Sequence, residues 1–195
     1  TEGSVNDLQE FFDVVKNNAD RLIRMVNDTL DLERIESGIF DLHLSEVDLL
    51  SLIKEVFTGL QTITSEKRIT FRITAASGVI FINADEDRIR QVLINLLSHA
   101  INYSPEESEI DISIRESEKE VTVSVQDKGP GIPPEVQKKI FDKFYTIGRK
   151  QGTGLGLAIC KGIIEAHHGE IYVINGKDGG STFYFNLPKK VEELK

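Results

Sequence analysis

Hydrophobic residues in the first 38 positions recur four and three residues apart, which is the spacing of a helical bundle or coiled coil. The positions that form this seam are Leu8, Phe12, Val15, Ala19, Leu22 and Val26. Further apolar side chains widen the stripe beyond a two-stranded seam: Phe11, Val14, Ile23, Met25 and Leu30. The pattern predicts one long helix over about residues 5–36, ended by Ser37 and Gly38. A helix this apolar needs partner helices or, as the alternative, the rest of its own chain to cover its stripe.

The remainder of the chain predicts a mixed α/β arrangement from about residue 40 to 188. Alternating apolar residues predict strands at 40–44, 68–74, 110–115, 120–127, 170–174 and 181–186. Helical spacing predicts helices at 47–64, capped by Asp48, at 85–103, at 133–140 and from 155 to about 167. Because the later strands follow one another as hairpins, we expect an α+β fold whose sheet is mostly antiparallel, with helices on one face.

Composition narrows the classes of partner. The chain has 195 residues, 39% of them hydrophobic, and a net charge of −9, which argues against nucleic acid or an anionic membrane as the main partner. Its single cysteine, Cys160, excludes an internal disulfide, fits a reducing compartment and falls on the apolar side of a predicted helix, so we expect a core residue. No apolar stretch approaches the ~20 residues of a membrane span. We therefore expect a cytoplasmic chain without direct membrane contact, whether or not a parent protein is membrane-anchored.

Two glycine-rich segments carry the candidate chemistry. Asp127 ends an alternating run and begins Asp-Lys-Gly-Pro-Gly, so its carboxylate can accept a hydrogen bond from an exocyclic amine such as that of adenine. Gly129 and Gly131 have no Cβ and let the backbone approach a flat ring. The segment Gly-Thr-Gly-Leu-Gly-Leu at 152–157 opens a helix, whose free N–H groups and positive end suit a polyphosphate. Together the segments predict a nucleotide site, although each could separately be an ordinary turn.

Six segments, in their order along the chain, resemble the motifs of a sensor histidine kinase. Residues 87–105 are similar to the asparagine-bearing helix of its ATP-binding domain, 127–133 to the adenine loop and 140–145 to the phenylalanine motif. Residues 152–159 are similar to the phosphate loop, 180–183 to the closing strand, and 18–38 to the second helix of the dimerisation and phosphotransfer domain. The resemblance implies a two-layer α/β sandwich of the gyrase and heat-shock-chaperone ATPase type. It divides the chain into a partial dimerisation helix at 1–38 and a catalytic ATP-binding domain at 39–195.

The resemblance also implies ATP and Mg²⁺ as cofactors and gives roles to individual residues. Asn95 is the catalytic position and a Mg²⁺ ligand, and His99 occupies the second metal position. The base and ribose side comprises Tyr103, Asp127, Gly129, Gly131, Ile132 and Thr182. The phosphate side comprises Gly152, Thr153, Gly154, Leu155 and Gly156. Phe141 and Phe144 anchor the lid that follows. For Tyr103 and the two phenylalanines, simple core packing is an equal alternative.

Several positions depart from the family pattern. The phosphoacceptor histidine belongs to the first dimerisation helix, and none of His43, His99, His167 or His168 has its context, with His43 expected in a strand. Either that helix was removed or the protein lacks it, so we do not expect this chain to phosphorylate itself there. The lid at 146–151 is six residues long and shorter than is typical, and His168 replaces a usual glycine.

Two departures concern the phosphates and the metal directly. His99 replaces a second asparagine, and Mg²⁺ prefers oxygen ligands whereas imidazole suits other metals. Asn102 replaces a frequent lysine, whose charge Arg149 or Lys150 could supply instead. These changes could weaken Mg²⁺-dependent chemistry while sparing adenine binding.

Three functions follow from this comparison. The leading interpretation is the catalytic fragment of a two-component sensor kinase, which transfers phosphate from Mg-ATP to a histidine outside this chain and then to the receiver domain of a response regulator. It would form a homodimer through the N-terminal helix in the full-length protein. The second is a degenerate pseudokinase that binds nucleotide or a partner protein, supported by His99 and Asn102. The third is an ATPase unrelated to histidine phosphorylation, against which the helix at 18–38 argues.

Overall fold

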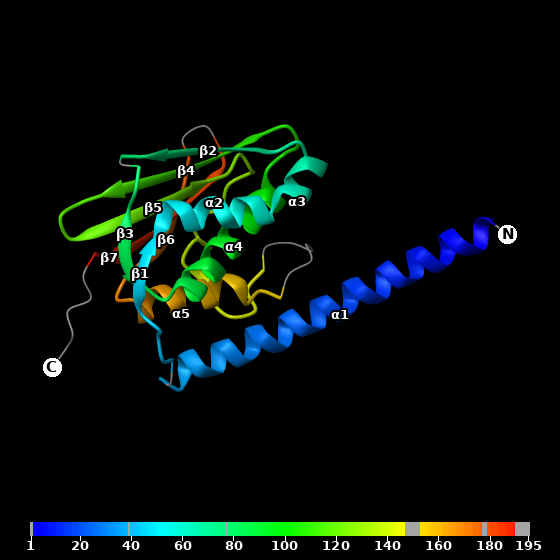
Figure 1. Cartoon of the computed structure of the whole chain (residues 1–195), viewed down its shortest axis with the longest axis horizontal. Helices are drawn as coiled ribbons and strands as arrows, with labels where there is room; N and C mark the ends of the chain where they lie inside the picture. The colour runs from blue at the N-terminus through cyan, green and yellow to red at the C-terminus, as the bar shows by residue number, and fades with distance from the viewer. Residues whose placement is uncertain (1, 39, 77, 147–152, 177–178, 190–195) are drawn as a thin grey trace.

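The computed structural model describes residues 2–38, 40–76, 78–146, 153–176 and 179–189, without the side chains of residues 2–10, 13, 17, 20 and 21. One long helix, α1 (Glu2–Glu36), leads into a mixed α/β body (Figure 1). The elements of that body are β1 (Ser45–Asp48), α2 (Leu49–Gly59), α3 (Gln61–Glu66), β2 (Thr70–Ala75), β3 (Phe81–Ala84), α4 (Glu86–Tyr103), β4 (Glu109–Glu116), β5 (Glu120–Gln126), the 3-10 turn η1 (Lys139–Phe141), α5 (Gly156–Ala166), β6 (Ile171–Asn175) and β7 (Ser181–Pro188).

The main sheet has five strands in the order β2-β4-β5-β7-β6. Only β2 and β4 run parallel, and the other neighbours are antiparallel, which confirms the predicted mostly antiparallel sheet. A separate antiparallel pair joins β1 to β3. Helices α2, α4 and α5 lie together on one side of the sheet (Figure 1). The α+β fold class is therefore as expected.

The core lies between the sheet and α4. Alternate residues of β5, Val121, Val123 and Val125, face inward and are almost fully buried. They meet the apolar face of α4, which comprises Ile89, Val92, Leu93, Leu96, Leu97, Ala100 and Ile101. Each such side chain contributes roughly 1.5–3 kcal/mol relative to exposure. Cys160 is also fully buried, as expected of a core residue, and burial raises the pKa of its thiol to about 12.

Three predicted elements were wrong in kind or in extent. Residues 40–44 form no strand among the described residues, and the first strand begins at Ser45, so His43 lies in a connecting segment. The predicted helix at 47–64 is two helices, because the backbone of Leu60 leaves helical geometry at φ −96° and ψ 1° between them. Asp48 is the expected cap, but it ends β1, and its carboxylate accepts the N–H groups of Leu50 and Ser51. The predicted helix at 133–140 consists of turns followed by η1.

Helix α1 packs on its own chain at one end only, and the expected partner helices stay a prediction. Its C-terminal end packs beside α5, with Leu32 buried, whereas its N-terminal part extends away from the body (Figure 1). Asp31 fixes the packed end, because its carboxylate accepts hydrogen bonds from Arg88 at 2.9 Å and Gln91 at 2.8 Å. Lys143 forms an ion pair with Glu36 at the last turn.

The backbone at the end of α5 explains why glycine is usual at the position of His168. His168 follows the helix and its cap with φ +61°, the left-handed region in which glycine is usual after a helix. The side chain at this position is therefore accommodated in a conformation that favours glycine.

Candidate functional site

Asp127 lies immediately after β5 and is 2% exposed. Its Oδ1 accepts hydrogen bonds from the N–H of Gly129 at 2.7 Å and of Ser181 at 3.2 Å. Burial raises the pKa of this carboxyl group, and the two backbone hydrogen bonds act in the opposite direction. Among the described residues no hydrogen bond reaches Oδ2, which therefore remains able to accept one from a ligand. Thr182, the next residue of β7, is 7% exposed and pairs with Gln126 beside it.

Gly129 is required where α4 ends. A Cβ at this position would lie 2.8 Å from Asp127 Oδ1 and 2.9 Å from the carbonyl oxygen of Tyr103, closer than real contacts allow. The absence of a side chain thus brings the loop 127–132 against the C-terminal end of α4. Gly131 has φ +80° and Ile132 is 5% exposed, so the loop turns sharply and places one apolar side chain inside.

Helix α4 presents three predicted residues on one face, because Asn95, His99 and Tyr103 are four residues apart. The rings of His99 and Tyr103 are stacked with centroids 4.4 Å apart. The ring of His99 also meets Phe183 edge-on at 4.9 Å. Asn95 Nδ2 donates to the carbonyl oxygen of Gly156 at 3.3 Å, which ties α4 to the start of α5.

The second loop has the features of a helix N-terminus without a cap. Gly154 has φ +69°, and a Cβ there would lie 2.6 Å from the carbonyl carbon of Phe144. Thr153 Oγ1 accepts the N–H of Leu155 at 3.2 Å. Among the described residues no side chain caps α5, so its first-turn N–H groups can meet a ligand, and the positive end of the helix dipole favours an anion there. Gly152 and most of the lid, residues 147–152, lie outside the described residues.

The two lid phenylalanines differ. Phe141 is buried and its ring lies 6.4 Å from that of Phe183, which is core packing. Phe144 is 69% exposed, has φ +60° and approaches Gly154 closely through its backbone. Only Phe141 is therefore held by the core.

Helix α4 brings the two loops into one site. Tyr103 touches the loop of Asp127, and Asn95 touches the start of α5. Eight residues of helix separate them, which is about 12 Å along the axis. That separation suits a nucleotide whose base lies at one end and whose phosphates lie at the other. The described residues contain no group of three or more histidine, cysteine or acidic side chains arranged for a metal ion.

Two contacts near the site were not predicted. Thr153 Oγ1 donates to Asp28 Oδ2 of α1 at 3.4 Å, and burial raises the pKa of Asp28 while this hydrogen bond lowers it. Asn175 contacts the backbone of Ile132 through its side chain. Nothing in the local pattern marks either residue, since both contacts join segments far apart in the sequence.

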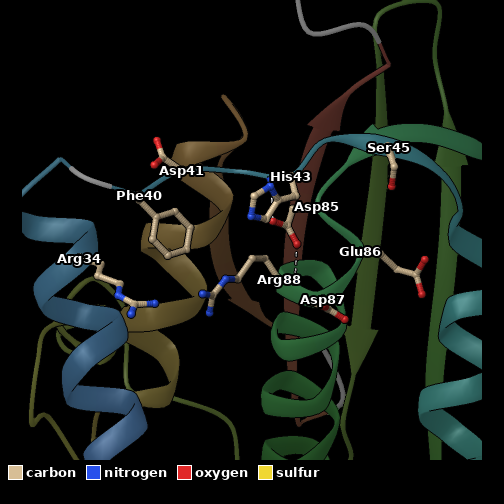
Figure 2. Close-up of a pocket in the computed structure, with 9 residues that line it drawn as sticks. All are labelled: Arg34, Phe40, Asp41, His43, Ser45, Asp85, Glu86, Asp87 and Arg88. Carbon is tan, nitrogen blue, oxygen red and sulfur yellow. Dashed lines mark hydrogen bonds between the residues drawn. The ribbon is translucent and has the colours of Figure 1, made fainter.

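A hollow of about 820 Å³ opens at the opposite end of α4 (Figure 2). Acidic groups at the start of α4 line it together with Arg34, Arg88 and Phe40, and the guanidinium carbon of Arg88 lies 5.0 Å from the centroid of the Phe40 ring. None of the predicted nucleotide-site residues lines this hollow, and its charges are mixed, so it does not have the character of the site described above.

Comparison with known proteins gives one family. Residues 84–191 match the family model of histidine kinase-, DNA gyrase B-, and HSP90-like ATPases. The adaptive-response sensory kinase SasA of Microcystis aeruginosa is 38% identical over 169 residues, which are 85% of this chain and 44% of that protein. The chain spans less than half the length of the curated relatives it matches.

Solved structures agree with this result. The catalytic domain of the histidine kinase ThkA has a TM-score of 0.71 and 39% identity, covering 75% of this chain and 96% of that one. ThkA in complex with the response regulator protein TrrA has a TM-score of 0.76 and 33% identity, covering 94% of this chain and 52% of that one. Within the described residues, no helix has the length and apolar character needed to cross a membrane.

Proposed function

The chain belongs to the family of histidine kinase-, DNA gyrase B- and HSP90-like ATPases, and on this premise we propose that it is the ATP-binding catalytic part of a sensor histidine kinase. Family membership implies ATP binding. The observation that carries the proposal is the face of α4, which joins a buried carboxylate at one loop to an uncapped helix N-terminus at the other. We propose a division into a partial dimerisation helix at 1–38 and a catalytic domain at 39–195, working in the cytoplasm where ATP is supplied.

Different residues of the proposed site bind the base, the ribose and the phosphates of the nucleotide. Asp127 Oδ2 accepts the adenine amine, with Thr182 beside it through water. The backbone of Gly129, Gly131 and Ile132 lines the base, and Tyr103 lines the ribose side. Thr153, Gly154, Leu155 and Gly156, with Gly152, hold the phosphates through N–H groups at the start of α5.

The metal position fits asparagine better than histidine. Because Asn95 Nδ2 donates to Gly156, its Oδ1 faces away from that bond and is a suitable oxygen ligand for Mg²⁺. The ring of His99 stacks on Tyr103 and meets Phe183 edge-on, and an imidazole is a poor Mg²⁺ ligand. Mg²⁺ held at Asn95 would neutralise charge on the phosphates. We propose that Asn95 is the ligand in practice and that His99 supports the pocket by packing.

The reaction is phosphoryl transfer from ATP to an imidazole nitrogen of a histidine outside residues 1–195. The chain contributes by orienting the nucleotide and by neutralising its charge, not by covalent chemistry. Its own buried histidine, His167, is unsuited as an acceptor because both ring nitrogens are engaged within the fold. A receiver domain of a response regulator is the proposed next acceptor, since the similar kinase ThkA was solved in complex with the response regulator protein TrrA.

A pseudokinase that binds nucleotide without efficient Mg²⁺ chemistry is the second candidate, favoured by the packed imidazole of His99 and by Asn102. One measurement distinguishes the pseudokinase from the active kinase. We would titrate ATP calorimetrically with and without Mg²⁺ into this chain and into His99→Asn. The kinase proposal expects Mg²⁺-dependent binding in both proteins, within about threefold of each other.

Mg²⁺-enhanced binding in His99→Asn alone would favour the pseudokinase. Asp127→Asn is the control for the base site. Its Oδ1 can keep both backbone hydrogen bonds, but it places an amide N–H₂ opposite the adenine amine, so binding should weaken roughly 100-fold, a loss comparable to hydrogen bonds to charged groups. If Asp127→Asn binds ATP as well as the parent chain, the nucleotide site is misplaced.

A further inference from the structure

The end of the β6–β7 hairpin holds the loop at 127–132. The N–H of Asp127 donates to the carbonyl oxygen of Ser181 at 2.9 Å. The N–H of Gly180 donates to the carbonyl oxygen of Gly129 at 2.8 Å. These two contacts fix the first half of the loop by backbone alone. They leave the second half, from Gly131 onward, to be fixed by something else.

The side chain of Asn175 holds that second half. Asn175 is the last residue of β6; its Oδ1 accepts the N–H of Ile132 at 2.9 Å, and its Nδ2 donates to the carbonyl oxygen of Ile132 at 2.7 Å. A side-chain amide thus pairs with the backbone of one residue in the way that a neighbouring strand would. Two bonds in opposite senses fix the orientation of that backbone as well as its position. Gln137 adds a third bond, from Nε2 to the same carbonyl oxygen at 3.1 Å.

The position that Asn175 fixes is next to the point of greatest backbone freedom in the loop. Gly131 has φ +80°, and a Cβ there would lie 3.4 Å from the Asn175 amide. Without a partner for Ile132, rotation about the glycine would let the peptide that faces the base move. A loop that is already ordered loses less conformational freedom when its ligand binds, which strengthens binding without any direct contact.

We propose that Asn175 is a positioning residue that pre-orders the base-binding loop for the nucleotide. The inference rests on the proposed function, and it adds a residue that belongs to none of the six motifs. Asn175 itself touches the loop and not the base, so its effect is transmitted through Ile132. It should therefore change affinity for the nucleoside part of the ligand.

Asn186 provides a matched control. It lies on β7, and its Oδ1 accepts the N–H of Glu170 at 2.6 Å. As at Asn175, a side-chain amide thus binds a backbone N–H next to a strand, here just before β6. Within the described part of the chain, Asn186 pairs with Thr122 and bonds Glu170, and no hydrogen bond joins either residue to the loop at 127–132. Replacing each asparagine by alanine removes the same chemical group from the same sheet, once beside the site and once away from it.

The experiment compares the 195-residue chain with Asn175→Ala and Asn186→Ala. The dissociation constant for ADP is measured by calorimetry, and hydrogen exchange of the Ile132 amide is followed by NMR. We expect about a tenfold rise in the ADP dissociation constant for Asn175→Ala, the size expected for losing a hydrogen-bonded support, with faster exchange at Ile132. Asn186→Ala should keep both quantities within twofold of the parent.

Two results would overturn the inference while leaving the nucleotide site intact. One is ADP binding by Asn175→Ala within twofold of a parent that binds. The other is an equal loss in both variants, which would show general destabilisation of the sheet. Failure of the parent to bind ADP would instead contradict the proposed function, and the inference would fall with it.

Discussion

Burial shifts the pKa of two ionisable side chains, Asp127 and His167, in opposite directions. Burial raises the pKa of Asp127, so its charged form costs the folded state stability as the pH rises above the usual carboxyl range. Asp127 lies where its carboxylate can accept a hydrogen bond from a ligand, which gives a functional reason for burying this charge. Burial lowers the pKa of His167, so its cost appears only in acid. His167 lies away from the proposed site and ties the start of α4 to the end of α5.

His167 makes stability depend on pH in a predictable direction. Its Nε2 accepts the N–H of Asp85 at 3.0 Å and its Nδ1 contacts the carbonyl oxygen of Ile163 at 2.8 Å, so the fold requires the neutral ring with its proton on Nδ1. Because the folded pKa lies below the unfolded value of 6.5, the unfolded state takes up the proton first as the pH falls. We expect the free energy of unfolding to drop below about pH 6.5, by at most about 1.4 kcal/mol per pH unit for this proton.

Urea unfolding at a series of pH values between 7.5 and 5 measures this slope. His167→Gln has no proton to gain in this range, so its stability should be lower overall but flatter with pH than that of the parent. His43→Gln is the control, because the side chain of His43 is exposed and the hydrogen bond from His43 to Asp85 comes from its backbone N–H, which the substitution keeps. An equal slope in the parent and His167→Gln would assign the acid sensitivity to other groups.

Helix packing depends on a glycine in α5. A Cβ at Gly162 would lie 2.6 Å from Cγ2 and 2.7 Å from Cδ1 of Ile35 on α1, so Ile35 must move if alanine is introduced. Alanine is intrinsically better in a helix by about 0.5–1 kcal/mol, so the body itself should not lose stability. We therefore expect Gly162→Ala to loosen the end of α1 while the melting temperature of the body stays equal or rises.

Hydrogen exchange of residues 28–36 measures the loosening, which should reach about tenfold in rate. Gly59→Ala is the matched control, because it ends α2 and a Cβ there meets nothing within 4 Å. It should leave exchange in α1 unchanged. Unchanged exchange in Gly162→Ala as well would mean that Ile35 adapts by rotation and that the remaining contacts of α1, among them the ion pair of Asp31 with Arg88, keep the helix docked.

Elements with long, regular patterns were predictable, and short ones were not. The stripe of α4 and the alternation in β4 and β5 repeat over several turns or residues, so periodicity located them. β3 has four residues, of which only Ile82 and Ala84 are buried, and it has no signal of its own apart from its partner β1. Because each lies in a local motif, the predicted site residues, whose binding roles stay predictions, were identified from the sequence. Asn175 and Asp28 were not, because their roles arise only when distant segments meet.

At the scale of the whole molecule, α1 has an apolar surface that its own chain does not cover. Phe11, Phe12, Leu22 and Val26 are between 58% and 64% exposed, although they fall on the predicted seam or beside it. Only the C-terminal end of the helix packs on the body (Figure 1). Isolated exposed apolar residues are ordinary, but a contiguous stripe along one helix marks an interaction surface. The proposed occupant is a second copy of this helix within a bundle.

This proposal predicts self-association that a charged seam would abolish. Sedimentation velocity of the parent chain should show a dimer at tens of micromolar, whereas the double variant Leu22→Glu with Val26→Glu should sediment as a monomer, because burying two carboxylates in an apolar seam is unfavourable. Arg24→Glu makes the same change in charge, −2, on the face of the helix opposite Leu22 and Val26, and this variant should remain dimeric. ADP affinity should agree within twofold in all three proteins, since the seam lies outside the nucleotide site. A monomeric parent, or a double variant that still dimerises, would show that the apolar stripe of α1 is not the dimer contact of this chain.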